Sequence, residues 1–175
     1  MKTRPLSTIA ALALLAGLAG CGYGLVGKGS NIPPDIKAVY LQPLENKTPR
    51  TQVEQFLTRA IADELVTRHR FSVISSESGA DAEISGSVIS FGATPVTFDN
   101  TGRATEYEIA IIAQVIFKRL DKEQHVLWKN DRYLFRESYP VMVSGTGYVD
   151  LENTALESAS KKFAQTMVSD LLEGF

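Results

Sequence analysis

The sequence predicts an α+β fold, a two-layer sandwich in which two amphipathic helices pack on one face of a four- to five-stranded, mostly antiparallel sheet. Residues 51–69 and 150–172 repeat apolar side chains at the three- and four-residue steps of a helix. Residues 106–120 alternate at the two-residue period of a strand. A chain of 175 residues with 44% hydrophobic and 22% charged side chains is typical of one globular domain.

The first twenty residues are typical of a secretory signal peptide. Lys2 and Arg4 precede an apolar run over residues 6–19, which is shorter than the roughly 20 residues that cross a membrane. The run ends in Leu18-Ala19-Gly20-Cys21, which resembles the bacterial lipobox. In a lipobox the cysteine is acylated and becomes the first residue of the mature chain. We therefore expect removal of residues 1–20 and a covalent lipid on Cys21, with no other cofactor.

A coincidental cysteine after an ordinary signal peptide is the alternative, but small residues at both preceding positions favour the lipobox. Bacterial lipoproteins with an aspartate after the cysteine tend to stay in the inner membrane. Gly22 occupies that position here, which indicates a lipid-anchored protein of the outer membrane that faces the periplasm.

Residues 21–35 are predicted to form the lipid anchor and a flexible tether, and residues 36–175 a single domain. Gly22 to Gly27 matches the G-x-G-x-x-G pattern of phosphate-binding loops. Such a loop must follow a strand and open a helix, whereas this segment follows the lipidated cysteine. Its glycines and two nearby prolines resist regular structure, so we interpret it as a tether.

A strand, a helix and a second strand are predicted next. Lys37 to Leu44 is rich in β-forming residues, and residues 46–49 form a turn. In the helix over 51–69, Thr51 and Glu54 have the spacing of a capping box. The apolar stripe of this helix consists of Val53, Phe56, Leu57, Ala60, Ile61 and Leu65. Residues 71–75 return as a strand, which permits a parallel β-α-β crossover.

Three further strands are predicted in the middle of the chain. The first covers residues 82–91, with Gly86 as a bulge or a point of close approach. Residues 92–102 are expected to hold an irregular crossing that ends in a turn at 99–102. The strand over 106–120 follows and pairs with residues 125–137 in a long hairpin.

The alternation within residues 106–120 separates an apolar face of the strand from a more polar one. The apolar face carries Tyr107, Ile109, Ile111, Ala113, Val115 and Phe117. The more polar face carries Glu106, Glu108, Gln114 and Lys118 among Ala110, Ile112 and Ile116.

The chain ends in a second predicted helix. A loop over residues 141–149 precedes it, and Asp150 is a candidate cap. The helix extends to about Leu172, and its apolar stripe consists of Leu156, Ala159, Phe163, Met167 and Leu171.

The sequence indicates no enzyme, no metal site and no nucleic-acid partner. The net charge of −2 provides no basic field for nucleic acid. One cysteine and two histidines are too few for a Cys- or His-rich metal site. His69 ends a helix, where its dipole favours cations, and His125 falls in a hairpin turn. Glu106 and Glu108 share a strand face, an arrangement that is common on solvated faces.

Basic and aromatic residues interleave on the strand over 125–137. Arg132 and Arg136 are predicted to share a face with Trp128 and Leu134. Such a strip suits an amphiphile with anionic headgroups, because the guanidinium fork matches phosphate. The alternative is a solvated edge strand whose long side chains only cover apolar surface.

The order of these features resembles the LPS-assembly lipoprotein family LptE across essentially the whole mature chain. The matching pieces are Cys21-Gly22-Tyr23-Gly24-Leu25, residues 36–41, Asn46-Lys47-Thr48, residues 80–86, Thr105-Glu106-Tyr107, Leu127-Trp128 and a C-terminal helix. Each piece is short, and their order together with the lipobox carries the resemblance.

The resemblance implies two helices on a four-stranded sheet and two partners, an LptD-type outer-membrane β-barrel and lipopolysaccharide. Members of the family plug that barrel, help it assemble and help lipopolysaccharide reach the cell surface, and binding of lipopolysaccharide through basic residues is reported. Where some members carry a basic residue before the long strand, this chain has Asp99 and Asn100, and residues 141–149 contain no lysine or arginine. Our candidate lipopolysaccharide-binding residues are therefore Arg103, Arg132 and Arg136.

A second family leaves an alternative open. The order strand, Asn-x-Thr, helix, strand and Ala-Asp…Gly also resembles the CsgG-like lipoproteins, which form or support outer-membrane secretion pores. A copurified single-chain barrel would indicate the first family, and a homo-oligomeric ring the second.

Overall fold

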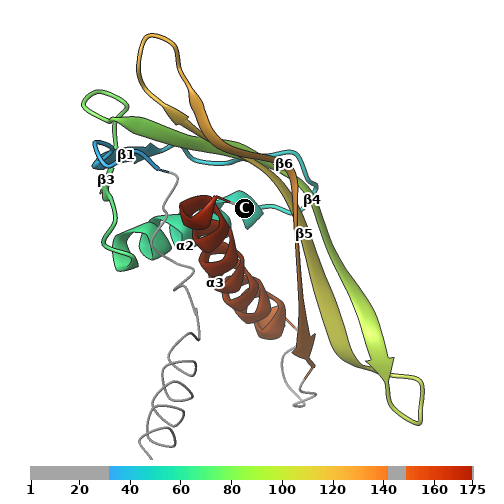
Figure 1. The fold of residues 1–175 in the computed structure, drawn as a ribbon. Helices are drawn as coiled ribbons and strands as arrows, with labels where there is room; N and C mark the ends of the chain where they lie inside the picture. Colours follow the sequence, from blue (N-terminus) through green and yellow to red (C-terminus); the bar gives the residue numbers. More distant parts are fainter. Residues whose placement is uncertain (1–31, 142–148, 175) are drawn as a thin grey trace, which may run out of the picture.

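A computed structural model of the chain describes residues 32–141 and 149–174, apart from the side chains of residues 149–152. Within these ranges, two helices cover one face of a mixed sheet (Figure 1). The elements are β1 Ala38–Leu41, β2 Glu45–Asn46, α2 Val53–Thr67, β3 Ser72–Ile74, β4 Ala82–Phe98, β5 Ala104–Arg119, β6 Val126–Pro140 and α3 Val149–Glu173. The strand order is β3-β1-β4-β5-β6, and β2 also pairs with β4. The predicted α+β class is confirmed, while the signal peptide, Cys21 and most of the tether lie outside the described residues.

The predicted parallel strand–helix–strand unit is present at the start of the domain. β1 and β3 pair in parallel, with Val39 opposite Val73, and α2 connects them. The carboxylate of Asp81 accepts hydrogen bonds from the amides of Ala38 (2.8 Å) and Lys37 (2.9 Å). Both hydrogen bonds lower the pKa of Asp81, and the bond from Ala38 has the larger effect. They also hold the start of β1 beside β4.

Helix α2 begins later than expected and lacks the predicted capping box. Gln52 is the N-cap residue, has a φ of 68° and makes no side-chain cap hydrogen bond, so Thr51 does not cap the helix. The carboxylate of Glu54 instead accepts a hydrogen bond of 2.7 Å from Nδ2 of Asn46. Asn46 lies in β2, a short strand that replaces the start of the turn predicted for residues 46–49.

Strands β4, β5 and β6 form a long antiparallel meander. β4 continues to Phe98, so the predicted irregular crossing after Phe91 is wrong. Register shifts at Ile89 and Val96 show that two β-bulges absorb extra residues while β4 stays paired with β5. Gly86 is the close-approach point that the sequence indicated, because a Cβ there would lie 2.1 Å from the carbonyl oxygen of Gln114.

The hydrophobic core lies between the helices and the sheet face that they cover, which we call the inner face. The alternation predicted for β5 is confirmed by its buried residues, Ile109, Ile111, Ala113, Val115 and Phe117, whereas Tyr107 of the same predicted face is only partly buried. The predicted helix stripes are buried as well, except that Phe56 is only partly buried. The opposite face of β4, β5 and β6, which we call the outer face, carries neither helix (Figure 1).

Helix α3 is attached to the edge strand β6 by polar and aromatic contacts. The hydroxyl of Tyr133 donates a hydrogen bond of 2.6 Å to Asp170. Burial, and then this carboxylate, raise the pKa of Tyr133 to about 12. Lys162 forms an ion pair with Glu137. The helix begins at Val149, one residue before the predicted cap Asp150.

We predict that Ile111→Asp unfolds or strongly destabilises the domain. Ile111 is fully buried on the inner face, and an unpaired buried charge costs about 3–5 kcal/mol. That cost approaches the whole stability of a domain, about 5–15 kcal/mol. Thermal unfolding monitored by circular dichroism measures the effect. Ile112→Asp is the matched control, since Ile112 is partly exposed on the outer face. Equal melting temperatures for the two variants would contradict the assignment of the faces.

Candidate functional site

The outer face is a grid of side chains from three antiparallel strands. Even-numbered residues of β5 form its middle column, and every one of them from Glu106 to Lys118 is partly exposed. The register places Ser90 opposite Ile112 on β4, and Leu134 opposite Ile112 on β6. Because neither α2 nor α3 covers this face, its side chains are available to a ligand or a partner as far as the described residues extend.

An apolar row crosses the middle of the outer face. Ile112 is flanked by Leu134 on β6 and by the bulged residue Ile89 on β4. Leu134 is 53% exposed and Ile89 is 41% exposed. The sequence placed Ile112 on the more polar face but gave no sign that this row is left uncovered, because exposure depends on where the helices pack.

Two of the predicted site residues, Arg132 and Arg136, lie on β6 on either side of Leu134, and both are exposed. The Nε atom of Arg136 is 3.9 Å from a carboxylate oxygen of Glu108, a loose ion pair. The amide of Arg132 donates to the side chain of Asn130. In the described part of the chain its guanidinium has no ion pair. Arg132 can therefore receive an anionic group directly, and Arg136 can do so by exchanging or sharing its loose pair with Glu108.

The predicted position of Trp128 on the same face as these arginines is wrong. Trp128 pairs with Phe117 and is buried on the inner face, where its ring meets Tyr133 edge-on at 6.2 Å. A register shift between Asn130 and Tyr133 inserts one residue and reverses the parity of the strand. Asn130-Asp131 was the available signal, because both residue types are depleted in strands.

A polar row lies beside the apolar one. The amide of Gln114 donates a hydrogen bond of 2.8 Å to Asp131, and the ammonium of Lys129 is 3.0 Å from the same carboxylate. The pKa of Asp131 is lowered, first by Gln114 and then by Lys129. The carboxylate of Asp131 is therefore ionised and locally balanced, so it does not cancel the charge of Arg132.

The third candidate, Arg103, does not join the other two. It lies past the β4–β5 turn, where its Nε atom is 3.1 Å from Asp99. The hydroxyl of Thr101, followed by the amides of Arg103 and Thr101, lowers the pKa of Asp99 to about 2. Arg136 lies opposite Ala110, so Arg103 is about 23 Å further along β5 at roughly 3.3 Å per residue. The three arginines therefore do not form one compact site.

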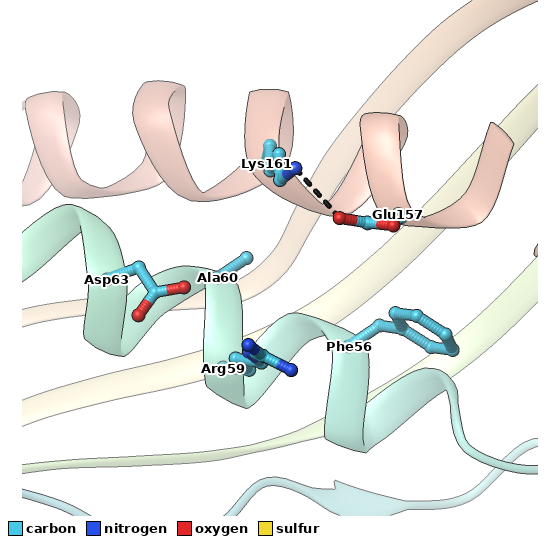
Figure 2. A pocket seen from close by; sticks show the side chains of 6 residues that line it. All are labelled: Phe56, Arg59, Ala60, Asp63, Glu157 and Lys161. Carbon is cyan, nitrogen blue, oxygen red and sulfur yellow. Dashed lines mark hydrogen bonds and ion pairs between the residues drawn. The ribbon is translucent and has the colours of Figure 1, made fainter. Parts of the chain in front are cut away.

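A separate cavity of about 240 Å³ opens between α2 and α3 (Figure 2). Its lining residues are Phe56, Arg59, Ala60, Asp63, Glu157 and Lys161. Lys161 pairs with Glu157 at 2.8 Å, which is the main reason why the pKa of Glu157 is lowered. Two cations and two anions balance in this groove, and it contains no nucleophile–base pair.

The described segments also contain no other arrangement with catalytic or membrane-spanning features. His125 is exposed at the β5–β6 turn, 3.4 Å from Asp121 and 3.1 Å from Glu123. No group of three or more His, Cys, Asp or Glu side chains in these segments is placed to hold a metal ion. None of their helices is both long and apolar enough to cross a membrane.

Comparison with solved structures gives likenesses at the level of the fold. The protein CT253 of Chlamydia trachomatis is 10% identical, covers 80% of this chain and 97% of its own, and has a TM-score of 0.53. A candidate lipoprotein of Caulobacter crescentus CB15 is 17% identical, covers 74% of this chain and 88% of its own, and has a TM-score of 0.50. The rare lipoprotein B of Shewanella oneidensis is 14% identical, covers 76% of this chain and 95% of its own, and has a TM-score of 0.45.

Comparison of the sequence with protein-family profiles identifies the family. No curated protein matches the sequence significantly. The family profile described as LptE, lipopolysaccharide-assembly, matches residues 36–171, which is nearly the whole predicted domain. With its two helices on one face of an open sheet, this chain belongs to the LptE family of lipopolysaccharide-assembly lipoproteins of the bacterial envelope.

Proposed function

We propose that this protein is an outer-membrane lipoprotein that assembles with and plugs an LptD-type β-barrel and takes part in moving lipopolysaccharide to the cell surface. The observation that carries the proposal is the LptE match over residues 36–171, which extends from before β1 to nearly the end of α3. That match favours this function over the secretion-pore alternative.

The uncovered outer face supports a role inside a barrel. The lumen of an outer-membrane barrel is polar, so a plug needs a surface of mixed character rather than a large apolar patch. The outer face has this character, since Glu106, Glu108 and Lys118 surround the row of Ile89, Ile112 and Leu134. This face can pack closely against a polar wall while its aliphatic row excludes water.

The two exposed arginines of β6 support contact with lipopolysaccharide. A guanidinium binds phosphate through paired hydrogen bonds, and lipopolysaccharide combines anionic headgroups with acyl chains. Arg132 and Arg136 lie on either side of Leu134, so charged and apolar contacts are adjacent on one strand. Arg103 is a separate candidate at the far hairpin.

The function is tested first by depletion of the protein from its native cell. We expect surface lipopolysaccharide to fall, and we expect the affinity-tagged chain to copurify with a single large barrel from solubilised envelopes. A homo-oligomeric ring in place of the barrel, with normal surface lipopolysaccharide, would refute the proposal.

We predict that Cys21→Ser blocks lipidation, because acylation needs the thiol. Metabolic labelling with a radioactive fatty acid should mark the wild-type protein and leave the variant unlabelled, as an uncleaved or unanchored form. Ser30→Ala is the matched control and should label normally. Equal label in the Cys21→Ser protein would show that the lipid is not on this residue.

We predict that Arg132→Glu with Arg136→Glu weakens lipopolysaccharide binding by at least about tenfold and spares association with the barrel. Two lost charge-assisted contacts, each worth about 1 kcal/mol or more, together with new repulsion account for this factor. Binding of labelled lipopolysaccharide to the purified chain and copurification of the barrel are measured in parallel.

The control for that experiment is Arg59→Glu with Lys122→Glu. It changes the net charge equally at two exposed positions off the outer face, one on α2 and one in the β5–β6 turn. Unchanged affinity in the Arg132/Arg136 variant would remove these arginines from the site. If the Arg132/Arg136 variant is folded but no longer copurifies with the barrel, the two arginines belong to the barrel contact instead.

A further inference from the structure

Part of β4 pairs with no described strand along the edge that points away from β5. β5 pairs with β4 along its whole length on one side. On the other side β1 pairs with Ala82–Ile84 and β2 pairs with Ser87 and Val88. Beyond Val88, no strand of the described residues pairs with this side, so residues 90–98 form a free edge (Figure 1).

The hydrogen-bonding pattern identifies which backbone groups point to this edge. The carbonyl oxygens of Ile84 and Val88 accept bonds from the amides of Gln42 and Lys47, so even-numbered residues face β1 and β2. The bulge at Ile89 adds one residue and reverses this parity. The N–H and C=O groups of Phe91 and Ala93 therefore point away from β5, as does the C=O group of Pro95.

The side chains around this edge differ from those that normally protect a free strand. Natural proteins discourage pairing at edges with charged side chains, above all lysine. Among the described residues, β6 is the free edge on the opposite side of the meander, and it carries five charged residues, Lys129, Asp131, Arg132, Arg136 and Glu137. β4 has no charged residue from Ile84 to Phe98, and its bulged or terminal residues Val96 and Phe98 are 47% and 56% exposed.

We infer that the edge of β4 at residues 91–95 binds an extended, uncharged segment of the barrel partner, which adds a strand to the sheet. This inference rests on the proposed function, because the segment belongs to the LptD-type barrel. A closed barrel has no free strand edge, so the segment is a loop that enters the lumen or a strand at an open seam. The bulge at Ile89 and the missing amide of Pro95 bracket the binding groups and fix its register.

The chemistry of the edge selects a protein segment over the other available occupants. Acyl chains offer no hydrogen bonds, so a lipid would leave the amides of Phe91 and Ala93 unsatisfied in a dry contact. The alternative occupant is a second copy of this chain. If the β4 edges of two copies paired antiparallel about a two-fold axis at Ala93, Phe91 of each copy would lie opposite Pro95 of the other. Two backbone hydrogen bonds would then be missing, because Pro95 has no N–H group. A strand from a different protein avoids this loss. It can pair with the carbonyl groups of Phe91, Ala93 and Pro95 and with the amides of Phe91 and Ala93.

The discriminating variant is Ala93→Pro. The amide of Ala93 points away from β5, so its removal deletes one intermolecular bond and no bond of the hairpin. Ala93→Ser is the matched control, because it keeps the amide and is also small. We expect Ala93→Pro to keep the wild-type melting temperature within a few degrees and to lower the amount of copurified barrel by about tenfold, with Ala93→Ser unaffected.

Amide hydrogen exchange on the wild-type full chain provides a measurement that needs no variant. We expect the segment over residues 90–94 to gain protection in the barrel complex relative to the detergent-solubilised chain alone. Unchanged exchange there, or normal copurification of a folded Ala93→Pro chain, overturns the inference and leaves the proposed function intact. If the wild-type chain binds no barrel, both this inference and the proposed function are refuted. A dimer of the chain alone that Ala93→Pro dissociates would assign the edge to a second copy instead.

Discussion

The strict alternation along β5 is the constraint on which the rest of the structure depends. Its odd-numbered residues from Ile109 to Phe117 are buried beneath two helices, and a shift of one residue would expose all of them. β5 is also the middle strand of the antiparallel meander, so its register decides which side chains of β4 and β6 face the core. By burying these five side chains on one face, the strand leaves the other face to a partner. The helices stabilise the domain, and the uncovered outer face carries the surface that a partner or ligand would contact.

The bulges adapt this rigid arrangement without loss of pairing. Each inserted residue changes the side on which the following side chains lie. On β6 the inserted residue allows Trp128 to be buried while Leu134 and Arg136 face outward on the same strand. On β4 the bulge at Ile89 turns the backbone groups of Phe91 away from β5. The exposed features that we connect with function therefore follow directly from irregularities within long strands, not from loops.

Periodicity was sufficient to predict the helices and the long hairpin, but it predicted neither the short strand β2 nor the irregularities within the strands. The helices, the long hairpin and the buried face of β5 depend on repeating contacts along one element, and such repeats are visible in a sequence. The end of β4, the capping of α2 and the face of Trp128 depend on single residues and on contacts between distant elements. Asn46 illustrates this, because its contact with Glu54 displaces a capping box that is correct in spacing alone. The candidate arginines were identified by type, yet only the register separates Arg103 from Arg132 and Arg136.

The contrast between the two edges of the meander links the fold to its surroundings. In the described part of the chain both edges expose unpaired backbone groups and contain bulges, and Pro95 also interrupts β4, which keeps a long edge from pairing indiscriminately. Only β6 carries charged side chains of both signs, and among them the exposed Arg132 and Arg136 suit an anionic ligand. β4 lacks charge over its whole free length, and its outward amides have no backbone partner among the described residues. A protein that works inside a partner can tolerate such an edge, because assembly removes it from water and from other copies. The distribution of charge between two equally exposed strands is therefore better explained by an assembled state than by the stability of the isolated domain.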